Sequence, residues 1–183
     1  MTDHLFIITG GPGSGKTTLI EALAARGVRC MSESGRAIIQ DQCAIGGDAL
    51  PWADRMRFAE LMLGWEMRSH REARGKAQSL EGPVIFDRAI PDVMGYLMLC
   101  GLPVPEPVRR AAELHRYNRR VFIAPYWPAI FHQDAERRQS PEEAEATFRM
   151  MERVYGALDY DLALLPLAPV EARADFVMAG IGL

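Results

Sequence analysis

One short stretch constrains this chain more than any other, the glycine-rich segment Gly10-Gly11-Pro12-Gly13-Ser14-Gly15-Lys16-Thr17. It matches the pattern G-x-x-x-x-G-K-[ST] at every fixed position. The apolar run before it, residues 5–8, is typical of a buried parallel strand, and residues 18–25 after it have the apolar spacing of a helix. In such a strand–loop–helix unit, free backbone N–H groups and the positive end of the helix dipole face one point. The sequence therefore predicts an anion site at this loop.

The same pattern is the one that cradles a nucleoside triphosphate, ATP or GTP, together with Mg²⁺. Lys16 is expected to reach the β- and γ-phosphates, and the Thr17 hydroxyl is expected to ligate the metal. No N-K-x-D motif for guanine is present, and adenine is usually bound through backbone groups, so the choice of base stays open. The residues expected to bind the nucleotide are Gly11, Pro12, Gly13, Ser14, Gly15, Lys16, Thr17 and Thr18.

Composition limits the remaining possibilities. The chain has 183 residues, 49% of them hydrophobic, which suits a single domain over residues 1–183 with a sizeable core. Its formal charge of −3 gives no global attraction to nucleic acid or to an anionic membrane, so neither is an expected partner. Three cysteines without C-x-x-C spacing, the lack of a signal-peptide pattern and the lack of a long apolar stretch favour a cytoplasmic protein. The oligomeric state stays open.

Apolar runs alternate with helical patterns along the whole chain. Strands are expected at residues 5–8, 28–31, 84–86, 121–124 and 160–165. Helices are expected at residues 18–25, 36–42, from 52 or 53 to 77, 92–100, 106–117, 141–158 and 170–181, although residues 176–178 could form a strand instead. This alternation predicts an α/β fold, a five-stranded parallel sheet with helices on both faces. Ligands then bind beyond the carboxyl ends of the strands.

Asp87 and Arg88 stand directly after the third predicted strand. Asp87 could hold Mg²⁺ through water or accept a proton from an attacking hydroxyl, or it could simply cap a turn. Motor-type ATPases usually place a glutamate after this aspartate to activate water. Arg88 can instead bind an anionic substrate or stabilise charge on the transferred phosphoryl group. The pair therefore favours transfer to an acceptor other than water.

Two further segments follow predicted strand ends. Glu33 and Arg36 come after the second strand and could bind a sugar hydroxyl or a phosphate of the substrate; equally, Arg36 could begin a helix and Glu33 could pair with it. Residues 126 to 140, after the fourth strand, are expected to form a lid over the phosphates, from which Arg137 or Arg138 would contact the triphosphate. The other interpretation of this segment is a solvated charged turn.

With these residues placed, the chain resembles the small-kinase branch of phosphate-loop (P-loop) proteins. More closely, it resembles a family of short domains described as AAA-type ATPases or predicted kinases, related to the ribosylnicotinamide kinase domain. The resemblance rests on GGPGSGKTT at the start and then, in order, on SESGR at 32–36, FDRAIPD at 86–92, DAERRQSPEEA at 134–144 and PVEARADFV at 169–177.

The resemblance implies a five-stranded parallel sheet with a kinase-like lid, ATP or GTP with Mg²⁺, and phosphoryl transfer to a small acceptor. It implies that Asp87 occupies the acidic base or metal position and that Arg88 contacts the substrate or a phosphate. It also implies that Arg137 and Arg138 belong to the lid, and that residues 166 to 169 form the loop that holds the purine.

The leading hypothesis is a Mg²⁺-dependent kinase that transfers the γ-phosphoryl group to a hydroxyl or phosphate of a nucleoside-like or nucleotide-like acceptor. Its catalytic residues would be Lys16, Asp87, Arg88, Arg137 and Arg138, acting mainly through positioning and electrostatics. The alternative is an ATP- or GTP-dependent switch or ATPase that hydrolyses slowly and acts on a protein partner. A polynucleotide kinase is disfavoured by the acidic balance of the chain. The sequence does not name the acceptor.

Overall fold

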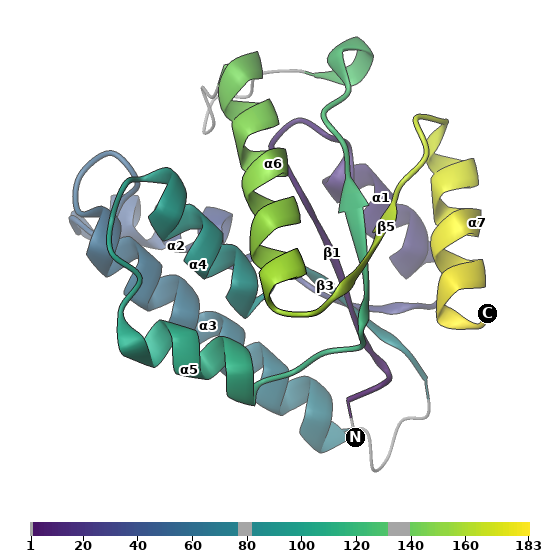
Figure 1. Cartoon of the computed structure of the whole chain (residues 1–183), viewed down its shortest axis with the longest axis horizontal. Coiled ribbons are helices and arrows are strands. Elements are labelled where there is room, and N and C mark those ends of the chain that lie inside the picture. Colours follow the sequence, from purple (N-terminus) through teal and green to yellow (C-terminus); the bar gives the residue numbers. More distant parts are fainter. Residues whose placement is uncertain (1, 77–81, 132–139) are drawn as a thin grey trace.

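The computed structural model describes residues 2–76, 82–131 and 140–183. Five strands form one sheet: β1 (Leu5–Gly10), β2 (Arg29–Met31), β3 (Val84–Asp87), β4 (Arg120–Ala124) and β5 (Asp161–Leu164). Neighbouring strands are all parallel, and their order is β2-β3-β1-β4-β5 (Figure 1). The predicted five-stranded parallel sheet is confirmed. β1, which leads into the glycine-rich loop, is the central strand.

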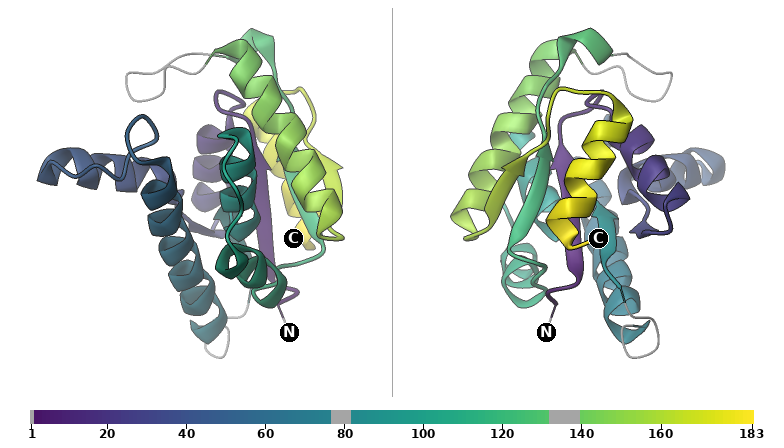
Figure 2. Two further views of the ribbon diagram at one scale, coloured as in Figure 1. Left: turned by 60° about the vertical axis from the view of Figure 1, so that its left-hand side comes forward. Right: turned by 90° about the vertical axis from the view of Figure 1, so that its right-hand side faces the viewer.

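One face of the sheet is covered by α1 (Lys16–Ala25) and α7 (Val170–Ile181), which pack side by side (Figures 1 and 2). Phe6 and Ile8 of β1 point to this face and contact Leu19 and Leu23 of α1 and Val177 of α7. These side chains are nearly or fully buried. Their burial joins the two ends of the chain in one apolar layer.

The opposite face is covered by α3 (Arg55–Lys76), α4 (Ile90–Leu99) and α6 (Pro141–Ala157). Leu5 and Ile7 of β1 point to this side and pack with Phe148 and Tyr155 of α6. Two more helices complete this layer, because α2 (Ser34–Ile45) packs on α3 and α5 (Glu106–Leu114) packs on α4. Helices on both faces explain why β1 is buried at every position rather than at alternate ones. In the described part of the chain, no helix has the length and apolarity that a membrane span requires.

The strand register brings the predicted site residues to one edge of the sheet. Ile8 pairs with Asp87 of β3, and Gly10 pairs with Ala124 of β4. The backbone N–H of Arg88 also donates to the carbonyl oxygen of Ile8 at 3.0 Å. The end of β3 therefore lies beside the strand that leads into the glycine-rich loop, as expected for the ligand-binding edge of an open α/β sheet.

Several predicted element boundaries were wrong. Helix α3 begins at Arg55 rather than at residue 52 or 53, because residues 50–53 form a turn and the Asp54 carboxylate accepts a hydrogen bond from the Arg57 N–H at 3.0 Å. Helix α4 begins at Ile90, two residues earlier than predicted. The alternative strand at residues 176–178 is also wrong, since these residues lie inside α7.

Candidate functional site

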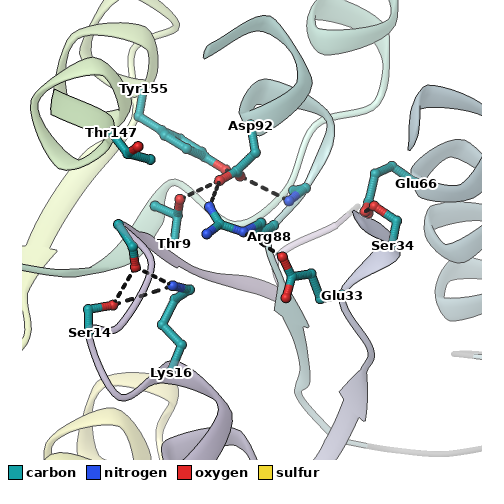
Figure 3. A network of polar contacts seen from close by, with 12 residues as sticks. Thr9, Ser14, Lys16, Glu33, Ser34, Glu66, Arg88, Asp92, Thr147 and Tyr155 are labelled. Carbon is teal, nitrogen blue, oxygen red and sulfur yellow. Dashed lines mark hydrogen bonds and ion pairs between the residues drawn. The ribbon is translucent and has the colours of Figure 1, made fainter. Parts of the chain in front are cut away.

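Lys16 closes the glycine-rich loop on itself (Figure 3). Its side chain is buried, and its ammonium donates hydrogen bonds to the carbonyl oxygen of Gly11 at 2.7 Å and to the Ser14 hydroxyl at 3.3 Å. The Ser14 hydroxyl donates to the same carbonyl oxygen at 2.8 Å. Thr17 and Thr18, in the first turn of α1, are exposed. A lysine across a loop that leads into a helix N-terminus is the donor set that a phosphate chain requires.

Close backbone neighbours explain two of the glycines. A Cβ atom on Gly10, which has a φ of +132°, would collide with the carbonyl oxygen of Ala124 in β4. A Cβ atom on Gly11 would collide with the carbonyl oxygen of Ala144 in α6. A side chain at either position would therefore displace a neighbouring backbone segment. The loop is held between β4 and α6, and its shape depends on both elements.

The predicted lid, residues 126 to 140, is described only at its two ends. A short 3₁₀ helix, η1 (Pro128–Ile130), follows β4. A Cβ atom on Gly13 would lie 2.6 Å from the ring of Phe131, and that ring makes an edge-to-face contact with Tyr126 at 5.8 Å between centroids. The described start of the segment thus packs on the glycine-rich loop. Arg137 and Arg138 lie outside the described residues.

Thr17 and Asp87 are the predicted metal ligands, and their surroundings fit a magnesium ion. Asp87 is a buried carboxylate at the end of β3, beside the central strand that leads into the loop. Thr17 offers an exposed hydroxyl at the start of α1. Magnesium binds oxygen ligands of these two kinds together with waters and phosphate oxygens. These residues could therefore hold Mg²⁺ with a bound triphosphate.

Arg88 lies between two carboxylates. Its φ of 70° is a left-handed conformation that residues with side chains rarely adopt. Its Nε donates to Glu33 Oε1 at 3.1 Å, and its Nη1 donates to Asp92 Oδ1 at 3.1 Å (Figure 3). Burial lowers the pKa of Arg88, but the carboxylates of Glu33, Asp92 and Asp87 outweigh burial and raise the pKa above its usual value. Glu33 is thereby held in a fixed position by a permanently charged partner.

Asp92 is the most heavily bonded side chain of the site. Its Oδ1 accepts from Arg88 and from the Thr9 hydroxyl at 2.5 Å; its Oδ2 accepts from the Tyr155 hydroxyl at 2.5 Å and from the Ala89 N–H at 3.0 Å. These donors come from β1, from α6 and from the segment between β3 and α4. Asp92 was missed as a functional residue by sequence reasoning. The available signal was a carboxylate in the first turn of a helix, four residues after an arginine.

A cavity of about 520 Å³, called here the side cavity, opens next to the loop. Pro12 of the glycine-rich loop is part of its wall, so the side cavity and the loop adjoin. Among the described residues, its apolar and aromatic wall includes Ile39, Trp52, Phe58, Met62, Val93, Tyr96 and Met151, and its charged lining consists of Glu33, Glu66, Asp92, Glu143, Arg55 and Arg88. Carboxyl groups therefore outnumber guanidinium groups in the lining.

Glu66 of α3 is the second functional candidate that sequence reasoning missed. It is 3% exposed and accepts a hydrogen bond from the Ser34 hydroxyl at 2.6 Å (Figure 3). Burial raises the pKa of Glu66 to about 8; the Ser34 hydrogen bond opposes this rise, and the charges of Asp92, Asp87 and Glu33 add to it. The signal in the sequence was a glutamate in line with Phe58 and Met62 at helical spacing.

The raised pKa of Glu66 predicts that the protein loses stability as pH rises from about 4.5 to about 8. The folded protein holds this proton to about pH 8, whereas the ordinary value is 4.5, so the free energy of unfolding falls as pH rises between these values. Glu66→Gln keeps an oxygen for Ser34 and cannot ionise. Urea unfolding should show the variant more stable than wild type at pH 8, by on the order of a few kcal/mol, with the difference vanishing near pH 4.5.

The matched control is Glu60→Gln, an exposed glutamate of the same helix. A constant difference across this pH range would contradict the assignment.

Of the three residues predicted to bind the substrate, the structure brings Glu33 and Arg88 together. Glu33 and Arg88 both line the side cavity. Asp87 lies at the sheet edge, but neither it nor Arg36 is among the described residues that line the cavity. The substrate role predicted for Arg36 stays a prediction.

A parallel sheet in the order β2-β3-β1-β4-β5, with a glycine-rich loop of the P-loop sequence pattern after its central strand, defines a P-loop α/β fold. The chain belongs to the AAA domain family, whose sequence profile matches residues 5–173. The resemblance inferred from the motifs is confirmed. No curated protein matches the chain significantly in sequence.

Solved structures with the same fold include a deoxyadenosine kinase, in two complexes, and the NadR protein. Deoxyadenosine kinase from M. mycoides with bound dATP superposes with a TM-score of 0.64 at 13% identity, over 98% of this chain and 100% of that one. The same enzyme with dCMP and a flexible dCDP bound gives a TM-score of 0.63 at 13% identity, over 96% and 97% of the two chains. The NadR protein in complex with NR gives a TM-score of 0.71 at 21% identity, and the chain spans 50% of its length. At these identities the likeness shows the fold.

Proposed function

We propose that this protein is a kinase that uses ATP or GTP with Mg²⁺ and phosphorylates a hydroxyl group of a small, phosphate-free acceptor bound in the side cavity. The observation that carries the proposal is the shared wall at Pro12, because it makes the triphosphate loop and the side cavity neighbours. A carboxylate, Glu33, lines this cavity and is held there by Arg88. A donor site, an acceptor site and a candidate base thus lie together, as phosphoryl transfer requires.

Each residue has a role that its surroundings support. Lys16 would bind the β- and γ-phosphates, exchanging its bonds within the loop for bonds to them. Glu33 would accept the proton of the attacking hydroxyl, because it faces the cavity whereas Asp87 does not line it. Arg88 would orient Glu33. Thr17 and Asp87 would hold Mg²⁺, which supplies positive charge to balance the charge on the phosphates. Arg137 and Arg138 are retained as proposed lid residues.

The lining of the side cavity supports an acceptor without a phosphate group. Among the described lining residues, the carboxylates of Glu33, Asp92 and Glu143 outnumber the two guanidinium groups even with Glu66 protonated, and Arg88 is already bonded to Glu33 and Asp92. An added phosphate would meet a surplus of negative charge. The rings of Trp52, Phe58 and Tyr96 offer flat apolar surface for a planar ring of the acceptor. A nucleoside combines such a ring with hydroxyl groups, and one structural neighbour is named as a deoxyadenosine kinase.

The proposal is tested by incubating the protein with ATP or GTP, Mg²⁺ and a panel of nucleosides that begins with deoxyadenosine and NR, alongside the matching 5′-monophosphates. At least one nucleoside should accelerate release of ADP or GDP and gain one phosphoryl group by mass spectrometry. The monophosphates should not. Lys16→Met should lower the rate by at least about 10²-fold, because the variant lacks the ammonium that would stabilise the negative charge of the phosphates. The melting temperature should not fall to a matching extent.

Arg68→Met, which removes an exposed cation of α3, is the matched control and should leave the rate unchanged. If no acceptor raises nucleotide consumption above background hydrolysis, the kinase proposal fails. Slow hydrolysis that a protein partner alters would then favour the alternative function, a nucleotide-dependent switch.

A further inference from the structure

Arg173 links the C-terminal helix to the back of the phosphate loop. It belongs to α7, yet its Nη1 donates a hydrogen bond to the carbonyl oxygen of Ser14 at 3.0 Å, across 159 positions of sequence. A Cβ atom on Gly15 would lie 2.7 Å from the same nitrogen. The Arg173 side chain is 3% exposed, so the guanidinium is packed between α7 and the loop rather than lying on the surface.

No described residue balances the charge of Arg173. Within residues 2–76, 82–131 and 140–183, Arg173 has no ion-pair partner, and its Nε has no hydrogen-bond acceptor. Glu171, in the first turn of the same helix, is exposed and forms no ion pair with it. Burial lowers the pKa of Arg173, and no neighbouring carboxylate opposes this shift. An arginine nevertheless keeps its proton at neutral pH, so this is a buried positive charge.

The helix dipoles add to this positive charge. Gly15 is the N-cap of α1, and Arg173 lies close to the start of α7, whose N-cap is Pro169. The N-terminus of each helix carries partial positive charge. The first turn of α1 contains no acidic residue. The guanidinium therefore lies close to the N-termini of both helices. This position favours an anion, and it disfavours the positive charge of Arg173 as long as no anion is bound.

The hydrogen bond of Arg173 also fixes the orientation of one peptide group. The C=O and N–H of a trans peptide point in opposite directions. Holding the Ser14 carbonyl toward α7 therefore turns the Gly15 N–H to the other side of the loop, away from α7. Backbone N–H groups of such loops are the donors to phosphate oxygens.

We propose that Arg173 is a positioning residue of the triphosphate site. It holds the Ser14–Gly15 peptide in the orientation that binds phosphate, and its buried charge is balanced when the anionic nucleotide arrives. The inference rests on the proposed triphosphate site at the loop. Its consequence is that the Arg173 charge stabilises the nucleotide-bound protein and not the free protein.

The test compares Arg173→Met, which keeps the length of the side chain without its charge, with Arg173→Lys, which keeps the charge. Calorimetric titration with ATP, ADP and AMP in the presence of Mg²⁺ gives the dissociation constants, and thermal unfolding gives Tm with and without each nucleotide. Arg173→Met should weaken ATP by about 10–10²-fold, ADP less and AMP least, since the number of balancing charges falls in that order. Its Tm without nucleotide should equal or exceed that of wild type. Arg173→Lys should recover part of the ATP affinity.

Arg26→Met is the matched control, because Arg26 joins α1 to Asp175 of α7 through a partly exposed ion pair and so reports on contact between the same two helices. It should leave the ATP, ADP and AMP constants unchanged. If Arg173→Met lowers Tm without nucleotide or fails to fold, or if it weakens the three nucleotides equally or not at all, the inference is overturned. If the wild-type protein itself binds no triphosphate, it is the proposed site at the loop that fails.

Discussion

Glu33→Gln is expected to slow phosphoryl transfer by about 10²–10⁴-fold, the range for loss of a general base, without weakening the binding of ATP. The amide oxygen of glutamine can still accept the hydrogen bond from Arg88 Nε, so the geometry of the pair is kept. The ability to take up a proton is lost, together with one negative charge beside Arg88, which keeps its ion pair with Asp92. The measurement is kcat with the best acceptor of the panel, together with the dissociation constant of ATP.

Glu143→Gln is the matched control, because Glu143 lines the same cavity but also accepts a hydrogen bond from the Ser140 N–H at the start of α6. It should change kcat little.

Asp87→Asn separates the two roles considered for Asp87, metal ligand and general base. Loss of a metal ligand should raise the Mg²⁺ concentration needed for half-maximal activity. If Asp87→Asn slows transfer at saturating Mg²⁺ while Glu33→Gln does not, Asp87 is the base and the role proposed for Glu33 is wrong.

Asp92→Ala is expected to lower the free energy of unfolding by about 3–5 kcal/mol, the usual result of removing one partner from a buried charge pair. Arg88 would keep Glu33 but lose its second carboxylate. The hydroxyls of Thr9 and Tyr155, both fully buried residues, would lose their acceptor. The measurement is urea unfolding at neutral pH.

Asp161→Ala is the control for this second prediction, since it removes an exposed ion pair with Arg119 and should cost no more than about 1 kcal/mol. Asp92→Asn should fall between the two, because an amide can still accept from neighbouring hydroxyls but carries no charge. A loss below about 1 kcal/mol for Asp92→Ala would mean that the cluster reorganises around Arg88 and that Asp92 does not hold it together.

The sequence was informative wherever the signal is local. The loop at 10–17 occupies consecutive positions, and apolar runs bounded by glycine and proline mark each strand. Fold class and loop could therefore be predicted without neighbours in space. Helix boundaries were harder, because they depend on single caps such as the Asp54 carboxylate at the start of α3.

The residues that sequence reasoning missed are those whose roles depend on distant partners. Asp92 accepts hydrogen bonds from the hydroxyls of Thr9 and Tyr155, which are 83 and 63 positions away in the sequence. Arg173 reaches Ser14 across 159 positions. Glu66 can be recognised as a candidate only once the fold places Ser34 and the nearby carboxylates around it. Each looked like an ordinary charged helix residue, because burial and the identity of the partner are properties of the fold and not of the local pattern.

Three of the α3 residues that line the side cavity, Phe58, Met62 and Glu66, stand four positions apart and so form a single line along one side of the helix. This line is separated in the chain from the loop that the proposed triphosphate would occupy. Substitutions at these three positions could therefore change the acceptor that the side cavity binds while the glycine-rich loop stays the same. Family members with identical glycine-rich loops and different residues at these three positions are expected to differ in the acceptors they use.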